Sequence, residues 1–125
     1  MAIIRKRYTA PSEVPIIDLG TLTEATAINY SDSSRVQTLT IDGVTVELTE
    51  GIGWPSDGYL VDLLLIITLL NDGAITWTLL DSTFPWLGSE PTFDNNTHQV
   101  VLRQLDFQVG GPSIHGIVNP FVAGS

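Results

Sequence analysis

The sequence contains no cysteine. Disulfide bonds and thiolate chemistry are therefore excluded, and the redox compartment is left open. Charged residues are also few, at 15% of the chain, against a usual fraction of about a quarter. This composition is typical of a protein that is partly covered by neighbours, or of one rich in uncharged polar strand residues. Both interpretations favour β-structure and assembly.

No apolar stretch is long enough for a membrane helix. The longest apolar run, residues 59–70, contains Asp62, and it falls short of the roughly 20 residues that a spanning helix needs. The basic N-terminus is not followed by the apolar segment of a signal peptide. We therefore expect a soluble protein that binds no membrane. At 125 residues it is expected to form one domain with its own core.

Positive charge is scarce and unevenly placed. The chain has 5 lysines and arginines against 14 acidic residues, and Arg5, Lys6 and Arg7 are three of those cations. Beyond Tyr8, two arginines face fourteen acids, a balance of −12. An anionic body of this kind argues against nucleic acid or an anionic membrane as a partner, because both require a basic face.

Residues 1–15 are expected to form an extended N-terminal arm, because Pro11 and Pro15 follow the basic stretch. One interpretation of this segment is a frayed terminus. The other is an arm that reaches onto an acidic neighbour, such as another copy of the same chain. In the second case the interface residues of the arm are Ile3, Ile4, Arg5, Lys6, Arg7 and Tyr8.

Residues 16–125 show strand signals at short intervals and no convincing helical period. Apolar and polar residues alternate strictly in residues 44–49, as a half-buried strand requires. Asp42-Gly43 and Asn71-Asp72-Gly73 predict two tight hairpins. The expected strands lie at residues 15–19, 25–30, 35–41, 44–49, 59–70, 74–80, 99–108 and 113–122.

Residues 59–70 are almost all leucine, isoleucine and valine, so a buried helix is an alternative to a strand. A strand is favoured because glycine flanks the run and a hairpin signal follows it. Such a strand must be covered on both faces, or lie centrally in a sandwich with one face against a partner subunit. The expected fold is all-β, an antiparallel β-sandwich or jelly roll of about eight strands in a single domain, residues 16–125.

An aromatic loop, residues 77–93, contains two of the three tryptophans, two phenylalanines and two prolines. We interpret it as a hydrophobic plug that closes the end of the sandwich. The alternatives are a subunit interface and a platform that stacks on sugar rings. The residues of the plug or interface are Trp54, Trp77, Phe84, Trp86 and Phe93, and the sugar platform would use Trp54, Tyr59, Trp77 or Trp86.

No motif for catalysis or cofactor binding is present in the sequence. The only histidines, His98 and His115, fall on separate elements, so neither is expected to act in chemistry. Asp94-Asn95-Asn96 offers oxygen ligands for calcium, but an Asx-rich turn needs no metal. We expect no enzyme activity, no cofactor and no bound metal.

The order of elements in residues 58–120 resembles a β-sandwich domain of virion proteins in tailed bacteriophages. Head-decoration (cement) proteins, head fibres and tail-fibre ends contain this domain. The pattern runs from an apolar strand and a turn through a Thr-Trp strand and a Trp-x-Gly-x-x-Pro loop to two further strands separated by glycines. The matching residues are 63–70, Asp72-Gly73, Thr76-Trp77, Trp86-Leu87-Gly88 with Pro91, 100–105, Gly110-Gly111 and Gly116.

The chain departs from the family pattern at three places. The family has a Trp-Pro dipeptide, whereas here Pro85 precedes Trp86, and Trp54-Pro55 lies in an earlier loop. Gln99 stands where the family often has aspartate, and His115 where it has an aromatic residue. These departures concern which virion part the resemblance indicates, and they leave the expected fold unchanged.

The resemblance implies a capsid decoration protein on the outer surface of a tailed-phage head, made in the host cytoplasm. Its partners would be other copies of itself, in a homo-oligomer expected to be a trimer, and the major capsid protein. The chain begins at Met1 and has no shaft repeats, so we expect a complete small protein rather than a fibre tip. One alternative is a tail-tip or receptor-binding module that recognises host surface glycans. Another is a tail or neck component that polymerises into rings.

Overall fold

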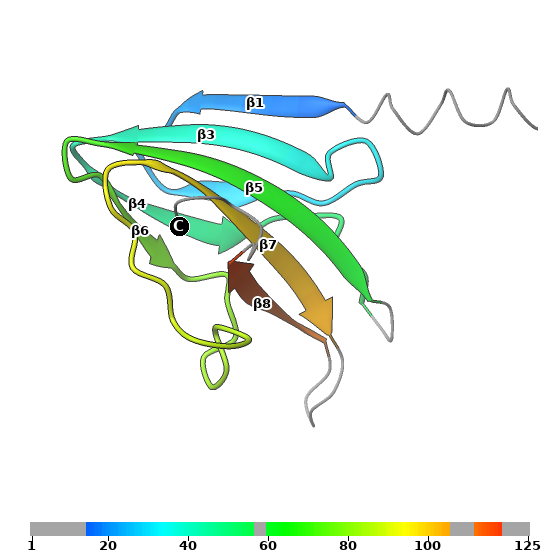
Figure 1. The fold of residues 1–125 in the computed structure, drawn as a ribbon. Helices are drawn as coiled ribbons and strands as arrows, with labels where there is room; N and C mark the ends of the chain where they lie inside the picture. Colours follow the sequence, from blue (N-terminus) through cyan, green and yellow to red (C-terminus); the bar gives the residue numbers. More distant parts are fainter. Residues whose placement is uncertain (1–14, 57–59, 106–111, 119–125) are drawn as a thin grey trace, which may run out of the picture.

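The computed structural model describes residues 15–56, 60–105 and 112–118, which form eight β-strands in two sheets and no helix (Figure 1). The strands of the larger sheet are, in spatial order, β1 (Ile16–Thr21), β3 (Val36–Asp42), β5 (Val61–Leu70), β7 (Thr97–Leu105) and β8 (Ser113–Val118). The smaller sheet contains β2 (Thr26–Ile28), β4 (Thr45–Glu50) and β6 (Ala74–Trp77). The expected all-β fold of eight strands is confirmed.

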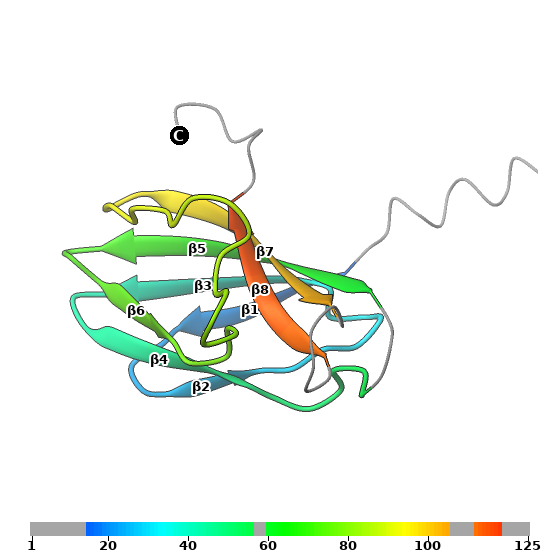
Figure 2. The same ribbon diagram turned by 90° about the horizontal axis from the view of Figure 1, so that it is seen from below.

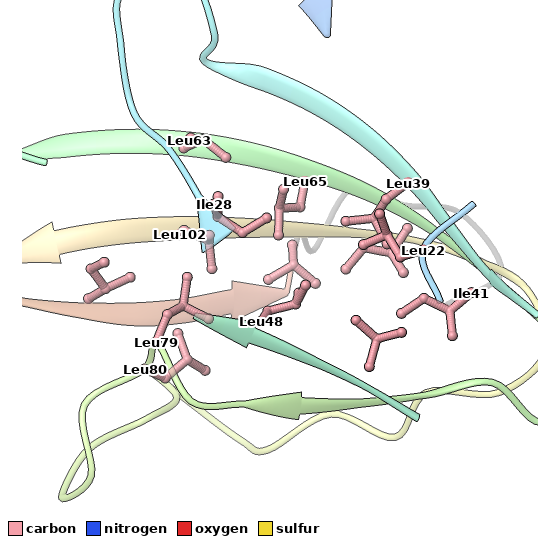
Figure 3. Packing of buried hydrophobic residues seen from close by; sticks show 14 of the residues in the cluster. Leu22, Ile28, Leu39, Ile41, Leu48, Leu63, Leu65, Leu79, Leu80 and Leu102 are labelled. Carbon is pink, nitrogen blue, oxygen red and sulfur yellow. The ribbon is translucent and has the colours of Figure 1, made fainter. Parts of the chain in front are cut away.

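The two sheets lie face to face with the hydrophobic core between them (Figures 2 and 3). Alternate residues of each strand point into this layer, because successive side chains of a strand point to opposite faces. In β4, Val46 and Leu48 are fully buried while Thr45 and Glu47 are exposed. Full burial of one such aliphatic side chain contributes about 1.5–3 kcal/mol.

The apolar run at residues 59–70 forms strand β5, so the alternative of a buried helix is wrong. β5 is the middle strand of the five-stranded sheet, as expected of an apolar strand that does not alternate. Its inner residues from Leu63 onward are fully or almost fully buried in the core, and its outer residues from Asp62 to Thr68 are half-buried. The inner residues are Leu63, Leu65, Ile67 and Leu69.

The expected antiparallel pairing is wrong for four of the six strand pairs. β1 with β3, β3 with β5, β2 with β4 and β4 with β6 are parallel. Only β5 with β7 and β7 with β8 are antiparallel. The chain crosses to the other sheet after each of the first six strands. Successive strands from β1 to β6 therefore alternate between the two sheets. These pairings do not form the antiparallel order of a jelly roll.

The two predicted hairpins are corners that lead from one sheet to the other, so the hairpin prediction is wrong. Gly43 has a φ of 72°, but Asp42 does not share the positive φ that a type I′ turn requires at both positions. The two corners lie beside each other: Gly43 N–H donates to Leu70 C=O at 2.9 Å, and Asn71 Nδ2 donates to Asp42 Oδ1 at 2.7 Å. A hairpin would leave β5 and β6 in one sheet, whereas the crossing lets β6 help cover the inner face of β5.

Candidate functional site

The segment between β6 and β7 runs along the outer edge of strand β8. Its backbone forms bridges to β8 at two points, Leu80 with Ile114 and Trp86 with Gly116. Two backbone hydrogen bonds join Gly116 to this segment. Leu87 N–H donates to the Gly116 carbonyl at 2.9 Å, and Gly116 N–H donates to Pro85 C=O at 2.8 Å. The segment therefore covers an edge strand that would otherwise present unpaired backbone groups.

Trp77, Trp86 and Phe93 form an aromatic cluster. The ring centroids of Trp77 and Trp86 lie 5.2 Å apart in an edge-to-face arrangement, and the Phe93 centroid lies 5.6 Å and 5.9 Å from them. All three side chains are half-buried and pack against the core. Gly116 makes room for the cluster, because a Cβ at this position would collide with the Trp86 ring. The structure thus brings together three of the five residues expected in the plug.

The other two residues of the expected plug lie elsewhere. Trp54 is 9% exposed, and its ring packs on Tyr30 with a centroid distance of 5.3 Å. Its indole Nε1–H donates to Ile28 C=O at 2.9 Å, which satisfies the buried donor. Phe84 is 51% exposed on the aromatic loop. The sequence analysis missed Tyr30, because no local pattern links it to a tryptophan 24 positions further along the chain.

The expected interface residues of the arm, residues 3–8, lie outside the described part of the chain, as does Tyr59. The arm therefore stays a prediction. Residues 106–108 and 119–122, the last parts of two expected strands, also lie outside the description.

The Asx-rich segment at the end of the aromatic loop fastens it to the corner after β5. Asn95 Oδ1 accepts from Asp72 N–H at 2.8 Å, and Asn95 Nδ2 donates to Asp72 Oδ1 at 3.1 Å. His98 Nε2 lies 3.2 Å from Asp94 Oδ1, and its ring stands edge-on to Phe93 at 5.2 Å. These polar side chains therefore connect the aromatic cluster to the turn between β5 and β6.

His115 lies at the contact between β8 and the aromatic loop. Its side chain is fully buried, with Nδ1 hydrogen-bonded to Phe84 C=O and Nε2 3.1 Å from Ser113 Oγ. A hydroxyl beside an imidazole is one part of a nucleophilic site. Here, however, the imidazole bonds to the loop backbone, so its contacts hold the loop on the strand. His98 and His115 lie on separate strands, as the sequence indicates.

Asp81 shapes the beginning of the aromatic loop. Its Oδ1 accepts hydrogen bonds from Thr83 N–H at 2.8 Å and Phe84 N–H at 2.7 Å. The Phe84 hydrogen bond is the main cause that lowers the pKa of Asp81 below its ordinary value of 3.8. The charged carboxylate is therefore the form that supports this turn.

Strands β5 and β7 carry an ion pair on the outer face of the five-stranded sheet. Asp62 and Arg103 are partners in the strand register. Arg103 donates through Nε and Nη2 to the two carboxylate oxygens, at 2.8 Å and 2.9 Å. This two-pronged hydrogen bonding to Asp62 raises the pKa of Arg103, so the guanidinium stays charged. Both side chains are partly exposed, and the pair leaves this position of the sheet with no net charge.

Beside the ion pair, one apolar residue from each strand forms a continuous outer row across the five-stranded sheet. Ile16 is 63% exposed, and the other members are half-buried. The strand register places them directly opposite one another. The outer row consists of Ile16, Val36, Leu64, Val101 and Ile117.

The outer face of the smaller sheet has a different character. Thr45, Glu47 and Thr76 are exposed there, and Thr78 Oγ1 donates to Glu47 Oε2 at 2.6 Å. A polar outer face is usual for a sheet that contacts water. The outer row is therefore specific to the larger sheet, and it is the strongest candidate for an interaction surface in the described residues.

The described strands and loops contain no helix that is long and apolar enough to cross a membrane. Comparisons with protein-family models, with curated proteins and with solved structures found no match. The surfaces of the chain itself are therefore the basis for a functional assignment.

Proposed function

We propose that this protein is a structural protein of a tailed-phage particle, a capsid decoration (cement) protein that binds the outside of the head as a homo-oligomer. The observation that carries this proposal is the outer row on the five-stranded sheet. An apolar row on the outer face of a sheet is typical of a surface that packs against another protein. The polar face of the smaller sheet would then remain in contact with water.

The sequence resemblance favours a virion part over other assemblies. Two of its elements are the Trp-x-Gly-x-x-Pro loop and the glycine of the closing strand. In the structure these elements are in contact, because Trp86 lies against Gly116. This contact gives a physical reason for a tryptophan and a glycine so far apart in the chain.

The proposed mechanism is stabilisation by binding. The sandwich caps a junction between shell subunits, and the N-terminal arm lies along a neighbouring molecule. A protein that binds the assembled shell but not its separated subunits stabilises the shell by mass action. At a free concentration of about 100 Kd, each occupied site adds about 2.7 kcal/mol. No covalent chemistry is required.

Immunogold electron microscopy of the source's virus particles tests this function, with antibody raised against the purified chain. We expect gold over the surface of the heads, and none on particles treated with antibody that was first absorbed with the purified protein. Gold confined to the tail or its tip would contradict decoration and favour the alternative below. Absence of label from every particle would contradict any virion role.

A tail-tip or receptor-binding module that recognises host surface glycans is the second candidate. The exposed ring of Phe84 and the half-buried rings of the aromatic cluster favour it, because an accessible aromatic face stacks on sugar rings. Titration with host polysaccharides, followed by tryptophan fluorescence, distinguishes the two functions. A saturable shift that is lost in Trp86→Leu would support the module, and an unchanged spectrum would contradict it.

A further inference from the structure

The outer row is flanked by Asp18 on one side and by the Asp62–Arg103 ion pair on the other. Asp18 lies two residues beyond Ile16 on the same face of β1, and its Oδ1 accepts from Thr38 Oγ1 at 3.1 Å. Asp62 lies two residues before Leu64 on the same face of β5, where it pairs with Arg103. An apolar strip with a carboxylate at one border suits a segment that contains both apolar and cationic side chains.

We propose that the outer row is occupied by residues 3–8 of a neighbouring copy of this chain. The inference rests on the proposed function, since it names the contact through which the copies assemble. Ile3, Ile4 and Tyr8 supply apolar surface for the row. The three consecutive cations of this segment, Arg5 to Arg7, meet Asp18 at the border of the row.

The lengths agree. Five strands span four inter-strand spacings, so the outer row is about 19 Å long at roughly 4.8 Å per spacing. Six residues in extended conformation cover about 20 Å. Residues 3–8 are therefore long enough to cover the row from Ile16 to Ile117, and residues 9–15 remain to connect the segment to β1.

Charge favours this segment over direct packing of two sheets. The described residues contain eleven acids and two arginines. Face-to-face packing would bring together two bodies that both carry this excess of negative charge, and like charges at an interface are unfavourable. Residues 5–7 contain three of the five cations of the whole chain. The basic segment is therefore the part of the chain whose charge complements the acidic body.

The direction in which the chain enters β1 favours docking of residues 3–8 on a neighbouring copy over docking on the same molecule. Residue Ile16 begins β1 at the edge of the sheet, and Pro15 immediately before it is exposed. Ala10 and Val14 each precede a proline, which favours extended backbone at both positions. A connection with extended backbone at these positions would lead away from its own sheet, whereas docking on that sheet would require a reversal within residues 9–15.

The absence of cysteine makes disulfide trapping a clean test. Full-length Ile4→Cys protein, labelled with ¹⁵N, is mixed with unlabelled full-length Val101→Cys protein and oxidised. The matched control replaces the second protein with Thr45→Cys, since Thr45 is exposed on the outer face of the smaller sheet. We expect at least a tenfold higher yield of the mixed dimer, identified by mass, with Val101→Cys than with Thr45→Cys.

Equal yields for the two pairs would overturn the proposal, and so would a lack of mixed dimers in both. A double variant with both cysteines in one chain tests the same-molecule alternative: an internal disulfide at monomer mass, without mixed dimers, overturns docking on a neighbour. Circular dichroism checks that each variant is folded, and Leu64→Cys replaces Val101→Cys if the latter is not. All of these results come from purified protein, so they are independent of where the protein lies on a particle.

Discussion

The ring of Trp86 lies against the backbone of Gly116, where no side chain fits. The residues on either side of this tryptophan, Pro85 and Leu87, are hydrogen-bonded to the same glycine. One position of β8 therefore fixes both the backbone and the side chain of the aromatic loop. The contact joins two parts of the chain that are 30 residues apart.

Gly116→Ala is expected to destabilise the protein by about 1–3 kcal/mol, because an added methyl group in a filled space forces its neighbours to move. Urea unfolding followed by circular dichroism measures this change. The same substitution in a Trp86→Leu background should be less harmful, since the colliding ring is absent, and the two effects should therefore not add. Equal costs in both backgrounds would contradict the proposed contact.

Strand β5 allows a matched comparison of its two faces. Leu65→Ala should destabilise the protein by about 2–5 kcal/mol, because Leu65 is fully buried in the core. Leu64→Ala should have a smaller effect on the isolated protein, since Leu64 is only half-buried on the outer row. Thermal unfolding of the two variants at equal concentration measures the difference. Leu64→Ala would be the more destabilising of the two variants if the outer face were the better packed one.

Asp81 predicts a pH dependence of stability. Its pKa in the folded chain is lowered from 3.8, mainly by the hydrogen bond from Phe84 N–H. The unfolded chain therefore binds the proton more readily, so the stabilisation is present above pH 3.8 and is lost as the pH falls through the lower folded pKa. Asp81→Asn should show a flatter loss of stability between about pH 5 and pH 2 than the unaltered protein. Urea unfolding across this range tests it, and parallel curves would exclude the role of Asp81.

Deletion of residues 1–12 is expected to leave a folded sandwich that no longer docks on its neighbours. The deleted residues precede β1, which begins at Ile16. Circular dichroism should be unchanged in shape, whereas binding to particles that lack the protein should be lost. Full binding by the truncated protein would refute the role of the arm. A matched full-length variant with Arg5, Lys6 and Arg7 changed to serine separates loss of charge from loss of length.

The positions of the strands were predictable from the sequence, but their pairing was not. The alternation in residues 44–49 and the apolar run in residues 59–70 depend on the face that each side chain presents, which is a local property. Asp42-Gly43 shows only that the chain turns. Whether the next strand lies in the same sheet or in the opposite one depends on what must be covered, and this involves residues far apart in the sequence.

The candidate site was predictable to the same degree. Trp77, Trp86 and Phe93 meet because one loop holds them, and their density in the sequence drew attention to it. Trp54 was grouped with them only by residue type, and it packs on Tyr30 instead. The outer row was not visible in the sequence, because it consists of single residues from five strands and exists only once the register is known.

The parallel pairing has a consequence for how this chain folds. Ile16 pairs with Val36 twenty residues on, and Val36 pairs with Leu64 twenty-eight residues on. Loops of this size must close before any parallel contact is made, and proteins dominated by such distant contacts fold in milliseconds to seconds rather than microseconds. The antiparallel pair β7 and β8 has the shortest connection among the paired strands, so it is expected to form early. The strands of the parallel pairs would then stay unpaired for longest when the complete chain folds. Aggregation competes with folding at this stage, before the two sheets close.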